Sequence, residues 1–529
     1  MKKAKLRFIN DIIDSNLFDC GEHLAIIFEE KRFTYRGLDE KINLVAGNLL
    51  KLSIHKGDKV AILLPNCPEF IICFFAISKI GAIPVPIGTR NRKIEIEHIL
   101  SHSGAKAIIS ISQFDQYDFQ TVLEELFPTL RSLKHIVILN PHASPRIKPY
   151  EVFEDNFDSK QWKSISEKLN ATQKSLKRDS LALILYTSGT TGNPKGVMLS
   201  HLNIIETLKS INSVVQAKKE DVYLVVVPMT SSLGCVTTML RAMIAGATLV
   251  LVKQFKAKPV LEIMEKERVT IEVGVPTMFV LQLMVPELSK YDLSALRLAF
   301  MSGADCLPEI VREVESKMNC KVYIGYGLTE STSYVTLTRQ EDPDKIKFNT
   351  VGSPIPGQKI TIVDNNGNKL KRGEVGEVLI KGCSVMLGFF KQSKLNHKTI
   401  RDGWMSTGDL GALDASGNLK LLGRKKDLII RGGFNIYPYE IENFLISHPK
   451  VQIVALVGIP DEVLGERSVA CIVLKQNVEA KPEEFLSYCK DSLSDYKVPD
   501  KVVFFDELPL TSNGKVKKGE LKTKLMENS

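Results

Sequence analysis

Short apolar runs alternate with amphipathic segments between residues 180 and 330. The runs contain mainly aliphatic residues, as do strands that are buried on both faces of a sheet. Between them, apolar residues recur at helical spacing from Ile204 to Val215, and Pro308 opens another helical stretch to Val314. This alternation predicts a largely parallel sheet in an α/β domain. The runs are LALILYT (181–187), VYLVVVP (222–228), ATLVLV (247–252) and LRLAFMS (296–302).

The rest of the chain has a different pattern. After Val351, Asn-Asn-Gly and Ser-Gly-Asn separate short alternating runs, which predicts an antiparallel β subdomain. From Pro438 onward we expect helix, strand, strand, helix, strand and a basic tail. A chain of 529 residues is too long for one hydrophobic core. The predicted boundary lies near GRKKD (423–427), which gives domains at 1–423 and 424–529.

Charge and cysteine usage exclude several classes of protein. Lys and Arg total 70 against 61 Asp and Glu, a net charge of +9 that suits small anionic ligands better than nucleic acid. The nine cysteines are scattered singly, which favours reduced thiols in a cytoplasmic protein. The longest apolar stretch, Phe70 to Ile77, falls short of the roughly 20 residues that a membrane span needs. Acidic residues follow the basic start of the chain, so we expect neither a signal peptide nor integral membrane association.

The segment YTSGTTGNPKGVMLSH (186–201) has the composition of a phosphate-binding loop. Glycines let backbone N–H groups approach an anion, while hydroxyls and a lysine add donors and charge. The segment is not a Walker A loop, because Lys195 is followed by Gly196 instead of Ser or Thr. Taken alone, it could also be a flexible surface loop.

TSGTTGNPKG also resembles the signature of the adenylate-forming (AMP-binding) superfamily, which includes acyl-CoA synthetases, aryl-CoA ligases, peptide-synthetase adenylation domains and firefly luciferase. Further segments resemble the other motifs of this superfamily in the same order, so that the resemblance covers nearly the whole chain. The form GFNIYPxEIE is most similar to fatty-acid and aryl CoA ligases. The matching segments are FTYRGLDE, SGAD (302–305), YGLTES (326–331), DGWMSTGDLG (402–411), GRKKD, RGGFNIYPYEIE (431–442) and PLTSNGKVKK (509–518).

The resemblance implies ATP, Mg²⁺ and coenzyme A as ligands. It assigns Thr329 to the α-phosphate, Glu330 to Mg²⁺, Asp409 and Arg424 to the ribose, and Lys515 to catalysis, with Thr329 and Glu330 also counted as catalytic. The implied ATP- or AMP-binding residues are Thr187, Ser188, Gly189, Thr190, Thr191, Gly192, Lys195, Gly303, Ala304, Tyr326, Gly327, Thr329, Asp409, Arg424 and Lys515. Without the other motifs, Glu330 would be read as a helix-cap residue and Lys515 as part of a solvated basic tail.

The resemblance also implies an acyl-CoA synthetase-like fold. Its large N-terminal domain contains two α/β subdomains and a β subdomain, and its small C-terminal α+β domain pivots near Lys426. Gly432 and Gly433 would enter the pantetheine tunnel after this rotation, although a Gly-Gly pair can equally form a plain turn.

The implied acyl pocket is mostly small or aliphatic, which favours a fatty or aromatic acid over an amino acid. One departure from the family concerns PMTSSLG (228–234), where Thr230 and Ser231 replace an aromatic residue and a histidine that many CoA ligases have. A small residue at position 231 leaves both the size of the acyl group and the thiol acceptor open. The implied pocket residues are Ser231, Leu233, Thr237, Val275, Gly303, Ile324 and Gly325.

The predicted function is therefore an AMP-forming acid:CoA ligase that acts on a small-molecule carboxylic acid. One alternative is a stand-alone adenylating enzyme that loads a carrier protein. A noncatalytic nucleotide-binding protein and a luciferase-like oxidase are further alternatives. No expectation about homo-oligomers follows from the sequence.

Overall fold

The computed structural model describes residues 6–187, 194–304, 306–510 and 516–527. The chain forms two compact units. Unit 1 contains Met1–Phe348, Gly352–Lys359 and Lys381–Met405, and unit 2 contains Asn349–Val351, Ile360–Ile380 and Ser406–Ser529. Helices and strands alternate through most of unit 1, which confirms the α/β class. The domain boundary at 423/424 stays a prediction. Within the described ranges, no helix combines the length and the apolar character that crossing a bilayer would require.

A nine-stranded sheet in unit 1 holds three of the four apolar runs. Its order is β18-β17-β16-β15-β14-β12-β13-β1-β2, and the six strands from β16 to β1 are parallel. The parallel sheet predicted for this region is confirmed. The strands are β1 (Leu24–Phe28), β2 (Lys31–Thr34), β12 (Val222–Val225), β13 (Thr248–Leu251), β14 (Ile271–Gly274), β15 (Leu298–Ser302), β16 (Lys321–Gly327), β17 (Tyr334–Leu337) and β18 (Ser353–Pro354).

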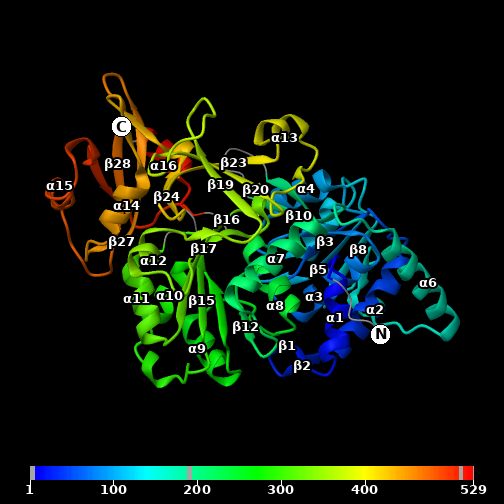
Figure 1. Cartoon of the computed structure of the whole chain (residues 1–529). Coiled ribbons are helices and arrows are strands. Elements are labelled where there is room, and N and C mark those ends of the chain that lie inside the picture. Colours follow the sequence, from blue (N-terminus) through cyan, green and yellow to red (C-terminus); the bar gives the residue numbers. More distant parts are fainter. Residues whose placement is uncertain (1–5, 188–193, 305, 511–515, 528–529) are drawn as a thin grey trace. The chain divides into compact units, whose positions relative to one another are not determined.

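The helices between these strands begin where the sequence indicates. The Ser200 side chain accepts a hydrogen bond from the Asn203 backbone and caps the first turn of α7, and Pro308 is the first residue of α11. Figure 1 shows α9, α10 and α11 (green) lying together beside β15. The helices are α7 (His201–Val215), α8 (Arg241–Ala245), α9 (Ala257–Lys266), α10 (Pro276–Leu283), α11 (Pro308–Lys317) and α12 (Asp344–Asn349).

A second, wholly parallel sheet is built from the first 150 residues, in the order β4-β3-β5-β8-β9. Buried aliphatic side chains of its strands pack against α4 and α5 in a continuous core. Apart from β1 and β2, the α-helices and strands between residues 11 and 175 are α1 (Asp11–Cys20), α2 (Tyr35–Lys51), β3 (Lys59–Leu63), α3 (Pro68–Lys79), β4 (Ile83–Pro86), α4 (Lys93–Ser103), β5 (Ala107–Ile111), β6 (Gln113–Phe114), β7 (Tyr117–Asp118), α5 (Phe119–Leu126), β8 (His135–Leu139), β9 (Ile147–Pro149) and α6 (Ser159–Ser175).

The remaining apolar run does not join the parallel sheet, so that part of the prediction is wrong. Strand β10 (Leu181–Thr187) pairs antiparallel with β11 (Lys195–Ser200), which in turn pairs antiparallel with β21 (Gly388–Phe389). Strand β11 was not among the predicted elements, because a helix was expected directly after the glycine-rich loop. Its buried Val197 and Leu199 alternate with half-buried Met198, a short strand pattern hidden between the glycine-rich segment and the helix cap.

Unit 2 contains the hairpin predicted around Ser-Gly-Asn. Strand β23 (Trp404–Leu413) begins in unit 1 and pairs with β24 (Leu419–Arg424), and the backbone N–H groups of Ser416 and Asn418 donate to the Asp414 carboxylate in the turn. The other strands and helices between residues 358 and 401 are β19 (Gln358–Val363), β20 (Gly376–Gly382), α13 (Ser393–Thr399) and β22 (Ile400–Arg401).

The C-terminal part of unit 2 has the predicted order of helices and strands, and it has one more helix. The basic tail forms α16 (Lys518–Glu527), whose Leu521 and Leu525 are buried against β27 and β28. Two leucines four residues apart lie on one helix face, so their spacing indicates a helix. The lysines around them led to the prediction of a solvated basic tail instead. The other elements are β25 (Ile429–Arg431), β26 (Phe434–Ile436), α14 (Pro438–Ile446), β27 (Val451–Asp461), β28 (Gly465–Leu474), α15 (Pro482–Lys490) and β29 (Lys501–Phe504), the last parallel to β28.

Candidate active site

The ends of the β10–β11 hairpin hold two of the predicted phosphate-binding residues. Thr187 and Lys195 are register partners, and the next pair is Tyr186 with Gly196. A Cβ atom on Gly196 would lie 3.0 Å from Ile184 and 3.1 Å from Tyr186, so this glycine permits close packing beside the loop. The predicted Ser188, Gly189, Thr190, Thr191 and Gly192 lie outside the described residues.

Three parallel strands bring further predicted residues to one sheet edge. Val275 follows β14, Gly303 follows β15, and Thr329 follows β16, and these three strands are neighbours. The carboxyl edge of an open parallel sheet is the usual position of a ligand site in α/β folds. Gly303 has φ +83°, and a Cβ atom there would lie 3.5 Å from the Val275 side chain. Gly303 and Ala304 are exposed at this edge.

The turn after β16 carries Thr329 and Glu330, whose side chains are half-buried. Buried Ser331 fixes the turn, because its hydroxyl accepts from the Leu328 backbone N–H and lies within hydrogen-bond distance of two carbonyl oxygens. The Glu330 carbonyl accepts a hydrogen bond from Met386 N–H at 2.9 Å. The backbone of the turn is therefore fixed on both sides of Glu330.

A strained residue, which the sequence does not reveal, follows this turn. Thr332 is fully buried and has φ +66°, a value that a β-branched residue rarely adopts. Its hydroxyl donates to the Ser384 carbonyl at 2.7 Å. Its own carbonyl accepts from the Ser232 hydroxyl at 2.9 Å. Strain of this kind persists only where surrounding contacts hold it, and here it lies two residues from Glu330.

Glu330 fits the role of a Mg²⁺ ligand. Mg²⁺ bound with a nucleotide is typically held by one or two protein carboxylates together with phosphate oxygens and water. A half-buried carboxylate on a fixed turn can serve in that way. Among the described residues, no group of three or more His, Cys, Asp or Glu side chains could form an all-protein metal cage.

Some predicted acyl-pocket residues are buried by other side chains. Thr237 lies in a π-helix, Leu233–Leu240, and its hydroxyl is 2.7 Å from that of Ser333. Ile324 and Gly325 are buried within β16, and a Cβ atom on Gly325 would lie 2.7 Å from the Tyr334 ring. Ser231 and Leu233 are half-buried, and the Ser231 hydroxyl donates to the Pro228 carbonyl. π-Helices are rare and occur often at functional sites.

Tyr326 and Gly327 complete the predicted residues of β16. Tyr326 is 7% exposed. Gly327 lies so close to the neighbouring strand β17 that a Cβ atom would fall 2.0 Å from the Ser333 carbonyl oxygen. Its absent side chain is a packing requirement of the turn that carries Thr329 and Glu330.

Unit 2 holds the predicted ribose-binding pair. Asp409 and Arg424 are register partners on β23 and β24, and Arg424 Nε lies 3.4 Å from an Asp409 carboxylate oxygen. Asp409 is buried, and its backbone N–H donates to the Thr407 hydroxyl. Lys426 lies in the short helix Lys425–Asp427 after β24. Gly432 and Gly433, with φ +55° and +86°, form the exposed turn between β25 and β26. Lys515 lies outside the described residues.

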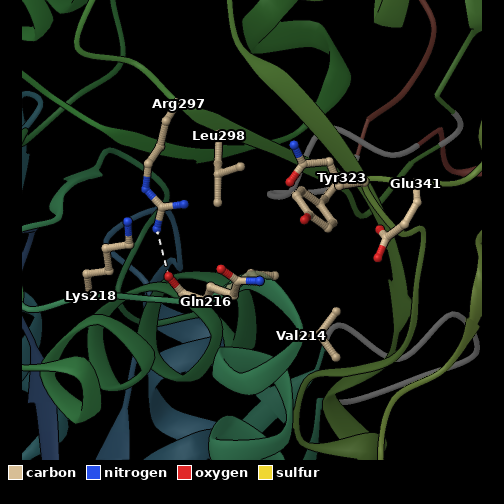
Figure 2. A pocket seen from close by; sticks show the side chains of 9 residues that line it. Val214, Gln216, Lys218, Arg297, Leu298, Tyr323 and Glu341 are labelled. Atoms are coloured by element: carbon tan, nitrogen blue, oxygen red, sulfur yellow. Dashed lines mark hydrogen bonds between the residues drawn. The ribbon is translucent and has the colours of Figure 1, made fainter.

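A cavity of about 410 Å³ in unit 1 contains none of the predicted residues. It lies where β15 begins, at the opposite edge of the sheet from Gly303. Figure 2 shows Arg297 turned toward Gln216, whose carbonyl it contacts at 3.3 Å, while its other partner is the Asp221 carboxylate. The cavity is therefore separate from the candidate active site.

Comparison with known proteins supports the assignment of the chain to one family. The AMP-binding enzyme family matches residues 16–390, and the AMP-binding enzyme C-terminal domain matches residues 440–515. The Bacillus subtilis protein YngI, which bears the name acyl-CoA synthetase, is 35% identical over 95% of this chain and 94% of its own length. The medium-chain acyl-CoA ligase ACSF2 of Bos taurus is 32% identical over 96% of this chain and 85% of its own length. The structure of the anthranilate CoA ligase AuaEII with anthranoyl-AMP covers the whole chain, with 25% identity and a TM-score of 0.86.

Proposed function

The chain belongs to the AMP-binding enzyme family of acyl-CoA synthetases, and from this premise we propose that it is an ATP-dependent acid:CoA ligase. It activates an apolar carboxylic acid as acyl-AMP and transfers the acyl group to coenzyme A. The observation that carries the proposal is the set of motif residues at the carboxyl edge of β14, β15 and β16, in a chain that aligns over nearly its whole length with named acyl-CoA ligases.

In the first half-reaction, a carboxylate oxygen bonds to the α-phosphorus of ATP and the bond to the bridging oxygen breaks, so that pyrophosphate leaves. Both reactants are anions, and the site must place cations and N–H donors where negative charge gathers. We assign Lys195 and Thr187 to the departing pyrophosphate and Thr329 to the α-phosphate. Glu330 would hold Mg²⁺, which neutralises phosphate charge when bound. Lys515 would contact the carboxylate and the α-phosphate oxygens.

The segments between these residues would complete the nucleotide site. Asp409 would accept hydrogen bonds from both ribose hydroxyls, and Arg424, paired with it, would keep the carboxylate in place. The exposed Gly303 and Ala304 leave room along the adenine ring. Tyr326 and Gly327 would shape the backbone beneath it. Residues 188–192 would add backbone and hydroxyl donors around the phosphates.

In the second half-reaction, the thiol sulfur of coenzyme A bonds to the acyl carbon, the bond to AMP breaks and the thiol proton passes to solvent. We propose that the C-terminal domain, 424–529, pivots near Lys426 between the two steps. Gly432 and Gly433 form an exposed turn with no side chains, which suits the close passage of a pantetheine arm. Conformational changes of this kind let one site assemble two catalytic sets in turn.

We propose a fatty or aromatic acid as the substrate. Val275 and Leu233 are apolar, and Ser231 leaves space where a larger side chain would stand. The relatives named for medium-chain acids and for anthranilate favour this class. None of the nine cysteines, all of which lie in the described part of the chain, forms a disulfide, which suits the reducing cytoplasm that we propose as its location.

The test is a panel of carboxylic acids scored by pyrophosphate release, with and without coenzyme A, and by mass detection of acyl-AMP. We expect release to depend on an acid, to accelerate with coenzyme A and to yield the thioester. A preference for a phosphopantetheinylated carrier protein over coenzyme A would support the carrier-loading alternative instead. If no acid in the panel gives acyl-AMP, the proposed function is wrong.

A further inference from the structure

Two histidines on helix α4 contact both ends of the β10–β11 hairpin. His98 Nε2 lies 2.9 Å from the Pro194 carbonyl oxygen, so this nitrogen donates a hydrogen bond to it. His102 Nδ1 lies 2.8 Å from the Tyr186 hydroxyl. The two imidazoles are one helical turn apart and stack, with ring centroids 5.4 Å apart and 11° between their planes. One face of α4 thus contacts the residue before Lys195 and the residue before Thr187.

These contacts fix the backbone that carries two proposed phosphate ligands. The Pro194 carbonyl belongs to the peptide that leads into Lys195, and Lys195 itself pairs with Thr187 across the hairpin. The Tyr186 ring packs edge-on against both histidines, at 6.5 Å from His98 and 5.8 Å from His102. A shift of α4 would therefore move both ends of the hairpin together.

The strand on the other side of β11 joins the same network. Phe390 N–H donates to the Gly196 carbonyl at 2.7 Å, and its ring packs edge-on against His102. Lys391 Nζ donates to the His102 carbonyl at 2.8 Å. All of these residues belong to unit 1, so the network lies within one compact unit.

The charge states of His102 and Tyr186 suit the contact between them. Burial lowers the pKa of His102 below its usual value, and the nearby His98 and Lys391 lower it further. Burial raises the pKa of the Tyr186 phenol. Near neutral pH a neutral imidazole therefore faces a protonated phenol, and the phenol can donate to Nδ1.

We propose that His98 and His102 are positioning residues that hold Thr187 and Lys195 in place for the pyrophosphate group of ATP. This inference rests on the proposed function. The ligand whose binding the two histidines support is a polyphosphate, and neither imidazole needs to contact it. The acid and the thiol should be unaffected, because none of these contacts involves the strand edge that carries Val275 and Gly303.

The experiment measures acid-dependent ATP–pyrophosphate exchange in His98→Leu, His102→Leu and Tyr186→Phe. The matched control is His397→Leu, since His397 is exposed on α13. One net hydrogen bond corresponds to about a 2- to 12-fold change in binding. We expect KM for ATP and for pyrophosphate to rise by about this factor in all three variants, with KM for the acid unchanged. His98→Gln keeps an N–H donor and should restore most of the affinity.

Exchange by the wild-type protein distinguishes a failure of the proposed function from a failure of the positioning role. If the wild type shows no exchange with any acid, the proposed function fails. If it exchanges and the three variants keep the control's ratio of KM for ATP to KM for the acid, the positioning role is wrong. Tyr186→Phe retains the ring and removes only the hydroxyl, so it decides the question if a leucine variant does not fold. An equal rise in KM for ATP and for the acid would show a general packing role and would also overturn the inference.

Discussion

Gly327 offers the sharpest test of how the candidate site is built. In Gly327→Ala, the new Cβ atom would lie 2.0 Å from the Ser333 carbonyl oxygen and 2.9 Å from Tyr334 Cα, whereas real Cβ atoms keep at least 3.0 Å from such neighbours. Strands β16 and β17 must separate by about 1 Å to accept the methyl group of the alanine. Because β16 ends at Gly327, that movement reaches the turn with Thr329 and Glu330 directly.

The expected result has two parts. A misplacement of about 1 Å costs about 10²-fold in rate, so the ATP–pyrophosphate exchange rate should fall by that factor. Overpacking of this kind destabilises by about 1–3 kcal/mol, so the midpoint of thermal unfolding should also fall. Circular dichroism would establish that the variant is folded at the assay temperature.

The matched control is Gly519→Ala on α16, where no atom lies within 4 Å of the new Cβ. It should keep the wild-type exchange rate. If Gly327→Ala is folded and exchanges within about 3-fold of Gly519→Ala, the glycine does not position the turn and this account of the site fails.

Three further changes test separate groups. Asp409→Asn should raise KM for ATP about 10- to 100-fold, since charge-assisted hydrogen bonds contribute about 1.5–3 kcal/mol; an unchanged KM would remove Asp409 from the ribose site. Lys515→Ala should slow exchange about 10²- to 10³-fold while thioester formation from supplied acyl-AMP survives, and normal exchange would contradict its role. Burial raises the pKa of Glu272 to about 7, and its partner Gln282 donates at 2.9 Å. The folded state therefore binds the proton more tightly than the unfolded state, and this contribution to stability is lost as pH rises from about 4.5 to 7. Urea unfolding at pH 5.5 and 8 should show a loss that Glu272→Gln reduces; equal losses in both proteins would contradict the assignment.

Local patterns predicted those elements in which one physical signal dominates. Helix α7 was predictable because the spacing of its apolar residues and the Ser200 cap both indicate a helix. Strand β15 was predictable because its short apolar run is typical of a strand buried on both faces, and all five of its residues are buried. Strand β11 was missed because its six residues lie between a glycine-rich segment and a helix cap. Helix α16 was missed because lysines outnumber its two buried leucines.

The candidate site was predictable as a set of residue types, and its construction was not. The motifs placed Thr329 and Glu330 in one segment, and parallel strand order then puts them near Gly303. Nothing local predicts φ +66° at Thr332, because the strain is held by Ser384, which is 52 residues away in the chain. The contacts of the α4 histidines could not be predicted from local sequence either, because Pro194 lies 96 residues from His98.

Helix α16 bears on how the protein can be modified. Leu510 and Val516 form a β-bridge on either side of the segment that contains Lys515, and the helix begins two residues later. Since Leu521 and Leu525 anchor that helix in the core of unit 2, a truncation after Val516 would remove the anchor and leave Lys515 one residue from a free chain end. Affinity tags or fusion partners therefore belong beyond Glu527. Under the proposed function, a proteolytic cut in the last dozen residues would impair the adenylation half-reaction that depends on Lys515.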